Sequence, residues 1–232
     1  MATILTQLAP WEGVFASHEH PLSRTLIPLS HLHQPLAERL ALWLAWTKNR
    51  ALQQIRIDPL LSHCAATPLA RCSDRVVFIS RRPSSWAESL ARKIRYQKLF
   101  PLIRTTPLLR PPAPAPIREL LQHRLPKESP YLMGLLAAYV ALHRAVDALQ
   151  LSEPILQLRY EDLYGAPGSV PWQQAWQRLW QALAWPVPIP WDQVQTLQQR
   201  RQNAAPVLLR RSLHDPKAVD AVVHGLIRHG WE

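Results

Sequence analysis

The sequence has few glycines, few cysteines and few acidic residues, and each shortage narrows what the protein can be. Six glycines in 232 residues leave little material for loops that bring the backbone close to a phosphate group. No Gly-x-x-x-x-Gly-Lys-[Ser/Thr] pattern occurs, so the usual phosphate-cradling loop is not present. The two cysteines, Cys64 and Cys72, match no common zinc-ligand spacing, and we therefore expect two ordinary thiols and no metal site.

Long hydrophobic runs are also missing. No apolar stretch reaches the roughly 20 residues that a membrane-spanning helix needs. The N-terminal residues lack the basic start and the apolar core of a signal peptide. We therefore expect no membrane span and a cytoplasmic protein.

Negative charge is in the minority. With 27 Lys and Arg against 16 Asp and Glu, the formal net charge is +11, which suits an anionic partner such as a nucleotide, a sulfated polymer, a membrane surface or nucleic acid. The basic residues are spread along the chain rather than gathered in a tail, which makes nucleic acid the weaker choice. The length suits one domain over residues 1–232, interrupted by a proline-rich loop at about residues 100–116.

The stretch Asp74–Ser89, DRVVFISRRPSSWAES, predicts a strand, a tight turn and a helix. The apolar run Val76–Ile79 is typical of a strand buried on both faces. Ser84 or Ser85 could cap the helix that follows. The free N–H groups of that helix, together with an arginine at the strand end, would form an anion site.

This stretch resembles the nucleotide-dependent sulfotransferases. Their strand ends in Arg-x-Pro-x-x-x-x-x-Ser, which falls here on Arg81, Pro83 and Ser89. The resemblance implies that Arg81 and Ser89 hold the 3′-phosphate of 3′-phosphoadenosine-5′-phosphosulfate (PAPS). The alternative is an ordinary strand–turn–helix unit with solvated arginines.

A second stretch supports the same resemblance. Pro154–Leu158 predicts another buried strand, and the residues Arg-Tyr-Glu-Asp-Leu follow at 159–163, with Pro167 beyond them. Sulfotransferases often carry this sequence after a strand. Its role is expected to be architectural, with Glu161 or Asp162 pairing with arginines and capping the turn.

The fold that the resemblance implies is α/β, a three-layer sandwich around a mostly parallel sheet of the P-loop NTPase type. Helical periodicity predicts helices over residues 36–54, 86–99, 117–123, 131–149 and 172–185, and near the C-terminus. Short strands are predicted at residues 14–20 and 55–59. The tryptophans of the helical segments are expected in the core.

The sequence signals for further site residues are less specific. Glu19 is the candidate general base for the acceptor hydroxyl, with His18 and His20 as rivals. Arg200 and Arg201 lie where some sulfotransferases place basic residues that reach the 3′-phosphate. A solvated basic helix end is the alternative for this pair.

The sequence also departs from the family. Ala2–Ala9 resembles the helix that follows the family's 5′-phosphosulfate loop, but the loop and the strand before it are missing. We therefore expect a sulfotransferase-like protein that is truncated and inactive as written; the family reaction is sulfuryl transfer from PAPS to a small-molecule or glycan acceptor through a hydroxyl or amine. The alternative is a non-catalytic basic protein that binds a polyanion, such as a sulfated glycan or nucleic acid.

Overall fold

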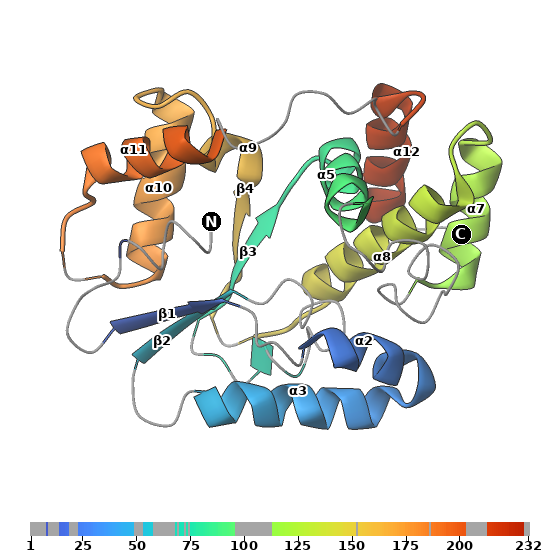
Figure 1. Cartoon of the computed structure of the whole chain (residues 1–232), viewed down its shortest axis with the longest axis horizontal. Coiled ribbons are helices and arrows are strands. Elements are labelled where there is room, and N and C mark those ends of the chain that lie inside the picture. Colours follow the sequence, from blue (N-terminus) through green and yellow to red (C-terminus); the bar gives the residue numbers. More distant parts are fainter. Residues whose placement is uncertain are drawn as a thin grey trace.

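The computed structural model describes residues 8, 14–18, 23–48, 53–57, 68, 70–71, 73, 75–95, 113–151, 153–185, 187–202 and 213–229. Within these residues the protein is mostly helical, with four short strands (Figure 1). The strands form two separate parallel pairs. Strand β1 (Val14–His18) lies beside β2 (Gln53–Ile57), and β3 (Val77–Ser80) lies beside β4 (Leu156–Arg159).

The pair β3–β4 has helices on both of its faces. On one face, Val77 and Ile79 pack against a core built by β4, α9 (Tyr160–Leu163), α10 (Val170–Ala182) and α11 (Trp191–Gln202). On the other face, Phe78 meets His143 of α8 (Pro130–Asp147), with 4.8 Å between the ring centroids. Successive residues of a strand point to opposite faces, which explains the alternation. The local order is therefore helix, sheet, helix, as an α/β protein requires.

A second core joins helices that are distant in the sequence. It contains buried residues of α5 (Pro83–Arg95), α7 (Ala115–Arg124), α8 and α12 (Pro216–His229), among them Ala87, Ile117, Leu136 and Val223. Figure 1 shows α12 beside α5, so the C-terminal helix covers the helix that follows β3. This packing places the last described helix next to the first motif of the sequence.

Proline, abundant in this chain, begins several of the helices. Pro83, Pro130 and Pro216 are the first residues of α5, α8 and α12. Pro116 and Pro171 are the second residues of α7 and α10. Proline suits these positions because the first N–H groups of a helix have no intrahelical partner. In α8, Ser129 completes the start by accepting a hydrogen bond from the Leu132 N–H at 3.3 Å.

Most expected elements are present with shifted ends. Helices α7, α8, α10 and α12 and the four strands lie where the sequence predicts them. Helix α5 starts at Pro83, so neither Ser84 nor Ser85 is its cap. The strand β3 is half-buried at all four positions rather than fully buried. Helix α2 (Ser23–Leu32), which contains Pro28, was not predicted.

The helix predicted over residues 36–54 is wrong at its end and in its buried face. Helix α3 spans Gln34–Lys48, and Gln53 and Gln54 belong to β2, where they pair with Val14 and Phe15. Trp43 was expected in the core but is 54% exposed, and Leu36 and Leu40 on the same helix are 43% and 37% exposed. The buried face is instead Ala37, Ala41 and Leu44. Helix α2 packs against α3, and periodicity alone does not show which face of a helix a neighbour will cover.

The expected single central sheet is represented in the described residues by the two parallel pairs. The described part of the chain is compatible with an α/β protein. Of Ala2–Ala9 only Leu8 is described, and it is buried beside α10 and α11. The proline-rich stretch lies outside the described residues up to residue 112.

Candidate functional site

The two sequence motifs meet in space at one edge of the β3–β4 pair. The parallel register places Ser80 opposite Arg159, so both strands end at the same edge. Arg81 and Arg82 leave β3 there, and Tyr160 and Glu161 leave β4 beside them. The carboxyl end of parallel strands is where α/β proteins bind their ligands. This edge is therefore the candidate site.

Glu161 holds the turn after β3. Its carboxylate accepts a hydrogen bond from the Arg82 backbone N–H at 2.9 Å and lies 3.6 Å from Arg82 Nε. The expected pairing of Glu161 with an arginine is therefore confirmed. Because the Arg82 side chain is largely exposed, the bond to the backbone is the stronger part of the link.

A second carboxylate occupies the start of α5. Asp220 of α12 accepts a hydrogen bond from the Ser84 N–H and another from the Ser84 hydroxyl. Ser84 is only 8% exposed. The expectation that these helix N–H groups are free for an anionic ligand is therefore wrong for Arg82 and Ser84. Their amides already donate to Glu161 and Asp220, which satisfy the positive end of the helix.

Three contacts fix the position of Arg81. Its Nε donates to Ser85 Oγ at 2.8 Å, and its guanidinium carbon lies 4.6 Å from the ring centroid of Tyr160. Its backbone carbonyl accepts a hydrogen bond from the Tyr139 hydroxyl at 2.5 Å. No described residue pairs with its two Nη groups, which remain available as donors. Arg81 is thus a half-buried cation in a defined position.

Ser85 and Ser89 continue from Arg81 along α5. Residues four apart lie on the same face of a helix, so the Ser89 hydroxyl is on the face that carries Ser85. Ser89 is exposed, whereas Ser85 is half-buried. The structure thus brings Arg81 and Ser89 to one stretch of surface and adds Ser85 between them. Ser85 was considered only as a cap, although its spacing of four to both residues could have identified it.

The remaining predicted site residues lie elsewhere or outside the described residues. Glu19 and His20 are outside them, just beyond β1. Arg200 and Arg201 belong to the last turn of α11, of which only the backbone is described there. Nothing is described of their side chains, so their contact with the 3′-phosphate stays a prediction.

Two titratable side chains of α8 contact the site: one bonds to the backbone of Arg81 and the other packs against Phe78 of β3. Tyr139 and His143 are neighbours on α8, with 4.2 Å between ring centroids. Burial raises the pKa of the Tyr139 hydroxyl, and the charges of Glu161 and Asp220 raise it further, so Tyr139 stays protonated and donates to Arg81. Burial lowers the pKa of His143 to about 4; Asp147 opposes this shift and His224 adds to it. The ring that packs against Phe78 and Tyr139 is therefore neutral at pH 7.

The described residues contain no cluster of three or more potential metal ligands. The same part of the chain has no helix that is long and apolar enough to cross a membrane. Comparisons with models of protein families, with curated proteins and with solved structures gave no match.

Proposed function

We propose that this protein binds a 3′-phosphorylated adenine nucleotide and is a sulfotransferase-like protein. The supporting observation is the fixed guanidinium of Arg81 at the carboxyl edge of β3–β4, followed by Ser85 and Ser89 on one face of α5. A guanidinium with free Nη groups and a nearby hydroxyl is a donor set that suits a phosphate. Glu161 and Asp220 act as structural acids that hold this frame.

The proposal extends to the reaction. PAPS, when bound, supplies a sulfuryl group for transfer to a hydroxyl or amine, and the fold would be of the P-loop NTPase type. In this reading Arg81 and Ser89 hold the 3′-phosphate, with Ser85 keeping the guanidinium of Arg81 in place. Glu19 is the proposed base, and Arg200 and Arg201 are proposed as additional phosphate contacts.

The test is binding of adenosine 3′,5′-bisphosphate, measured by titration calorimetry at fixed salt. Arg81→Ala should weaken binding about 10- to 100-fold, the effect of losing a hydrogen bond to a charged group of about 1.5–3 kcal/mol. Arg81→Lys keeps the charge but loses the planar fork, and should be intermediate. Arg118→Ala, at an exposed arginine of α7, removes the same charge far from the site and should bind like the wild type.

A second nucleotide identifies the phosphate that Arg81 contacts. Adenosine 5′-monophosphate lacks the 3′-phosphate and should bind the wild type more weakly than the bisphosphate does. In Arg81→Ala this difference between the two nucleotides should largely disappear. If it persists at its wild-type size, Arg81 does not hold the 3′-phosphate and the proposed site is wrong.

The net charge of +11 favours a second candidate, a non-catalytic protein that binds a polyanion. Such a protein would bind heparin or single-stranded nucleic acid with affinity that falls steeply with salt. Its preference for the bisphosphate over the monophosphate would reflect only the extra charge, so the preference would persist in Arg81→Ala and weaken with salt. The nucleotide comparison therefore separates the two candidates.

A further inference from the structure

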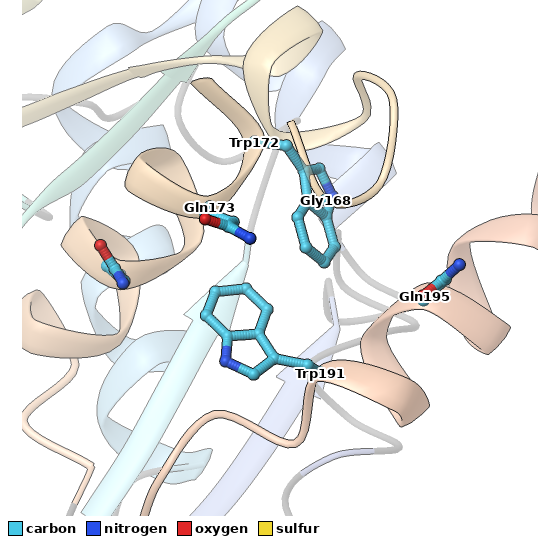
Figure 2. Close-up of a pocket in the computed structure, with 6 residues that line it drawn as sticks. Gly168, Trp172, Gln173, Trp191 and Gln195 are labelled. Carbon is cyan, nitrogen blue, oxygen red and sulfur yellow. The ribbon is translucent and has the colours of Figure 1, made fainter. Parts of the chain in front are cut away.

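A pocket of about 370 Å³ lies between α10 and α11, away from the candidate site (Figure 2). Its volume is within the range of about 300–1,000 Å³ that is common for small-ligand sites. The lining residues come from both helices and from the loop before α10, and they are Gly168, Trp172, Gln173, Gln177, Trp191 and Gln195. None of these side chains is ionisable, although the chain as a whole is strongly basic.

Two indole rings form the apolar part of the pocket. The rings of Trp172 and Trp191 are 5.1 Å apart between centroids and are inclined by 46°. Trp172 is 3% exposed and backs the pocket from inside the protein, whereas the half-buried Trp191 presents the indole surface that a ligand can reach. Large aromatic faces of this kind favour a ligand with a flat C–H surface.

Trp172 is held rigidly by a buried amide. Trp172 Nε1 donates to Gln198 Oε1 at 2.8 Å, and Gln198 Nε2 donates to the Gly165 carbonyl at 2.8 Å. Gln198 is 0% exposed. The indole N–H of Trp172 is thus already used inside the protein, and its ring is fixed before any ligand arrives. A preorganised surface binds with a smaller loss of entropy.

Three glutamines supply the polar part. Gln173 and Gln177 are one helical turn apart on α10, and Trp191 and Gln195 are one turn apart on α11, so each pair shares a face. Figure 2 shows the Gln173 side chain pointing toward the two indole rings. The three amides are exposed and have no hydrogen-bond partner among the described residues. Each amide offers two N–H donors and one carbonyl acceptor.

We propose that this pocket binds a neutral oligosaccharide. A sugar ring combines a face of C–H groups, which would stack on Trp191, with hydroxyls that can both donate to and accept from the glutamine amides. The absence of charge in the lining argues for a neutral sugar rather than a sulfated or phosphorylated one. On the Gly168 side a methyl group would meet no atom within 4 Å, so a chain of sugars can extend into solvent.

A proline-rich peptide is the other ligand that aromatic grooves bind. Its carbonyl groups could accept from the glutamine N–H groups, but proline has no N–H to donate. The glutamine carbonyls would then keep only water as a partner, which makes the sugar the better match. The proposal does not depend on Arg81 or on nucleotide binding, so either can fail alone.

The experiment uses the full chain and four neutral tetrasaccharides: maltotetraose, cellotetraose, mannotetraose and chitotetraose. Saturation-transfer NMR identifies which of them binds, and titration up to about 10 mM gives its affinity. We expect at least one to bind and to receive saturation at its ring C–H protons. Because no lining group is charged, the affinity should be the same at about 50 and 200 mM NaCl.

Variants locate the site. Trp191→Ala should weaken binding about tenfold or more, and Gln173→Ala and Gln177→Ala should each weaken it severalfold. Trp43→Ala is the matched control, because Trp43 is an exposed tryptophan of α3 outside the pocket, and its affinity should equal that of the wild type. If Trp191→Ala does not fold, the two exposed glutamine variants decide.

Four outcomes would overturn the proposal. These are no binding of any of the four sugars, unchanged binding in the Trp191 and glutamine variants, and a steep loss of affinity with salt. The fourth is binding of a peptide with the chain's own sequence PPAPAP, residues 111–116, when none of the four sugars binds. That result would show that the pocket recognises proline-rich segments.

Discussion

Asp220 of α12 accepts hydrogen bonds from both the backbone N–H and the hydroxyl of Ser84, at 2.8 and 2.9 Å. The two residues are 136 positions apart in the chain. This contact ties the C-terminal helix to the first turn of α5, directly beside the Arg81 turn. It stabilises the candidate site through Asp220, a residue outside both sequence motifs.

Replacement of Asp220 tests this support. Asp220→Asn keeps the size of the side chain but removes its charge from the N-terminus of α5. We expect a loss of about 1–3 kcal/mol in the free energy of unfolding, measured by urea titration. Glu119→Gln, at an exposed position of α7, should change it by less than about 0.5 kcal/mol. Equal stability of the Asp220 variant and the wild type would show that the two bonds contribute nothing net.

Tyr139 is expected to position Arg81. Tyr139→Phe removes the hydroxyl that donates to the Arg81 carbonyl and should cost about 1–2 kcal/mol in stability. Adenosine 3′,5′-bisphosphate should also bind severalfold more weakly, because the turn that carries the guanidinium loses one of the contacts that fix it. Tyr160→Phe is the control: it removes a tyrosine hydroxyl in the same site while keeping the ring below Arg81. A Tyr139 variant that loses stability but binds the nucleotide normally would limit Tyr139 to a structural role.

His143 predicts a pH dependence of stability. Its pKa is lowered to about 4 in the folded protein, from about 6.5 in an unfolded chain. Between these values the unfolded state binds more protons than the folded state. The contribution of neutral His143 to the free energy of unfolding is therefore fully present above about pH 6.5 and falls as the pH drops toward 4. The loss from this one group is at most about 3 kcal/mol.

The variant that tests this is His143→Phe, which keeps an aromatic ring against Phe78 and Tyr139. Its unfolding free energy should fall less steeply between pH 6.5 and 4 than that of the wild type. His123→Gln, at an exposed histidine of α7, should keep the wild-type slope. The same slope in all three proteins would mean that His143 is not the group that titrates.

Gln198 should be essential for the core between α10 and α11. Gln198→Ala leaves the Trp172 N–H and the Gly165 carbonyl without their partner. Each unpaired buried group costs about 1–3 kcal/mol, so a loss of about 2–5 kcal/mol in unfolding free energy is expected. Gln195→Ala, on the exposed side of the same helix, should be within about 0.5 kcal/mol of the wild type. A small effect of Gln198→Ala would mean that water replaces the amide.

The sequence predicted the site in part. The strands β3 and β4, the helix after Arg81 and the pairing of Glu161 with an arginine all follow from local patterns and lie where expected. The prediction that Ser84 caps α5 was wrong, because its side chain instead donates a hydrogen bond to Asp220. The contact of Tyr139 with Arg81 could not be predicted, since nothing in the pattern of α8 marks which of its buried residues lies below the β3 turn.

Local sequence by itself determined that most of the helices and strands form, to within a few residues, because proline at a helix start, apolar periodicity and short β-branched runs act over a few residues. It missed α2 and assigned Gln53 and Gln54 of β2 to a helix. Tertiary structure alone decided which faces are covered and which distant groups meet. It buried Ala37 and Ala41 of α3 and left Leu36 and Trp43 exposed. It also brought Asp220 to Ser84 and placed Trp191 beside Trp172. The physical reason is that burial and hydrogen bonding depend on the partner that packs against a segment, and that partner is encoded elsewhere in the chain.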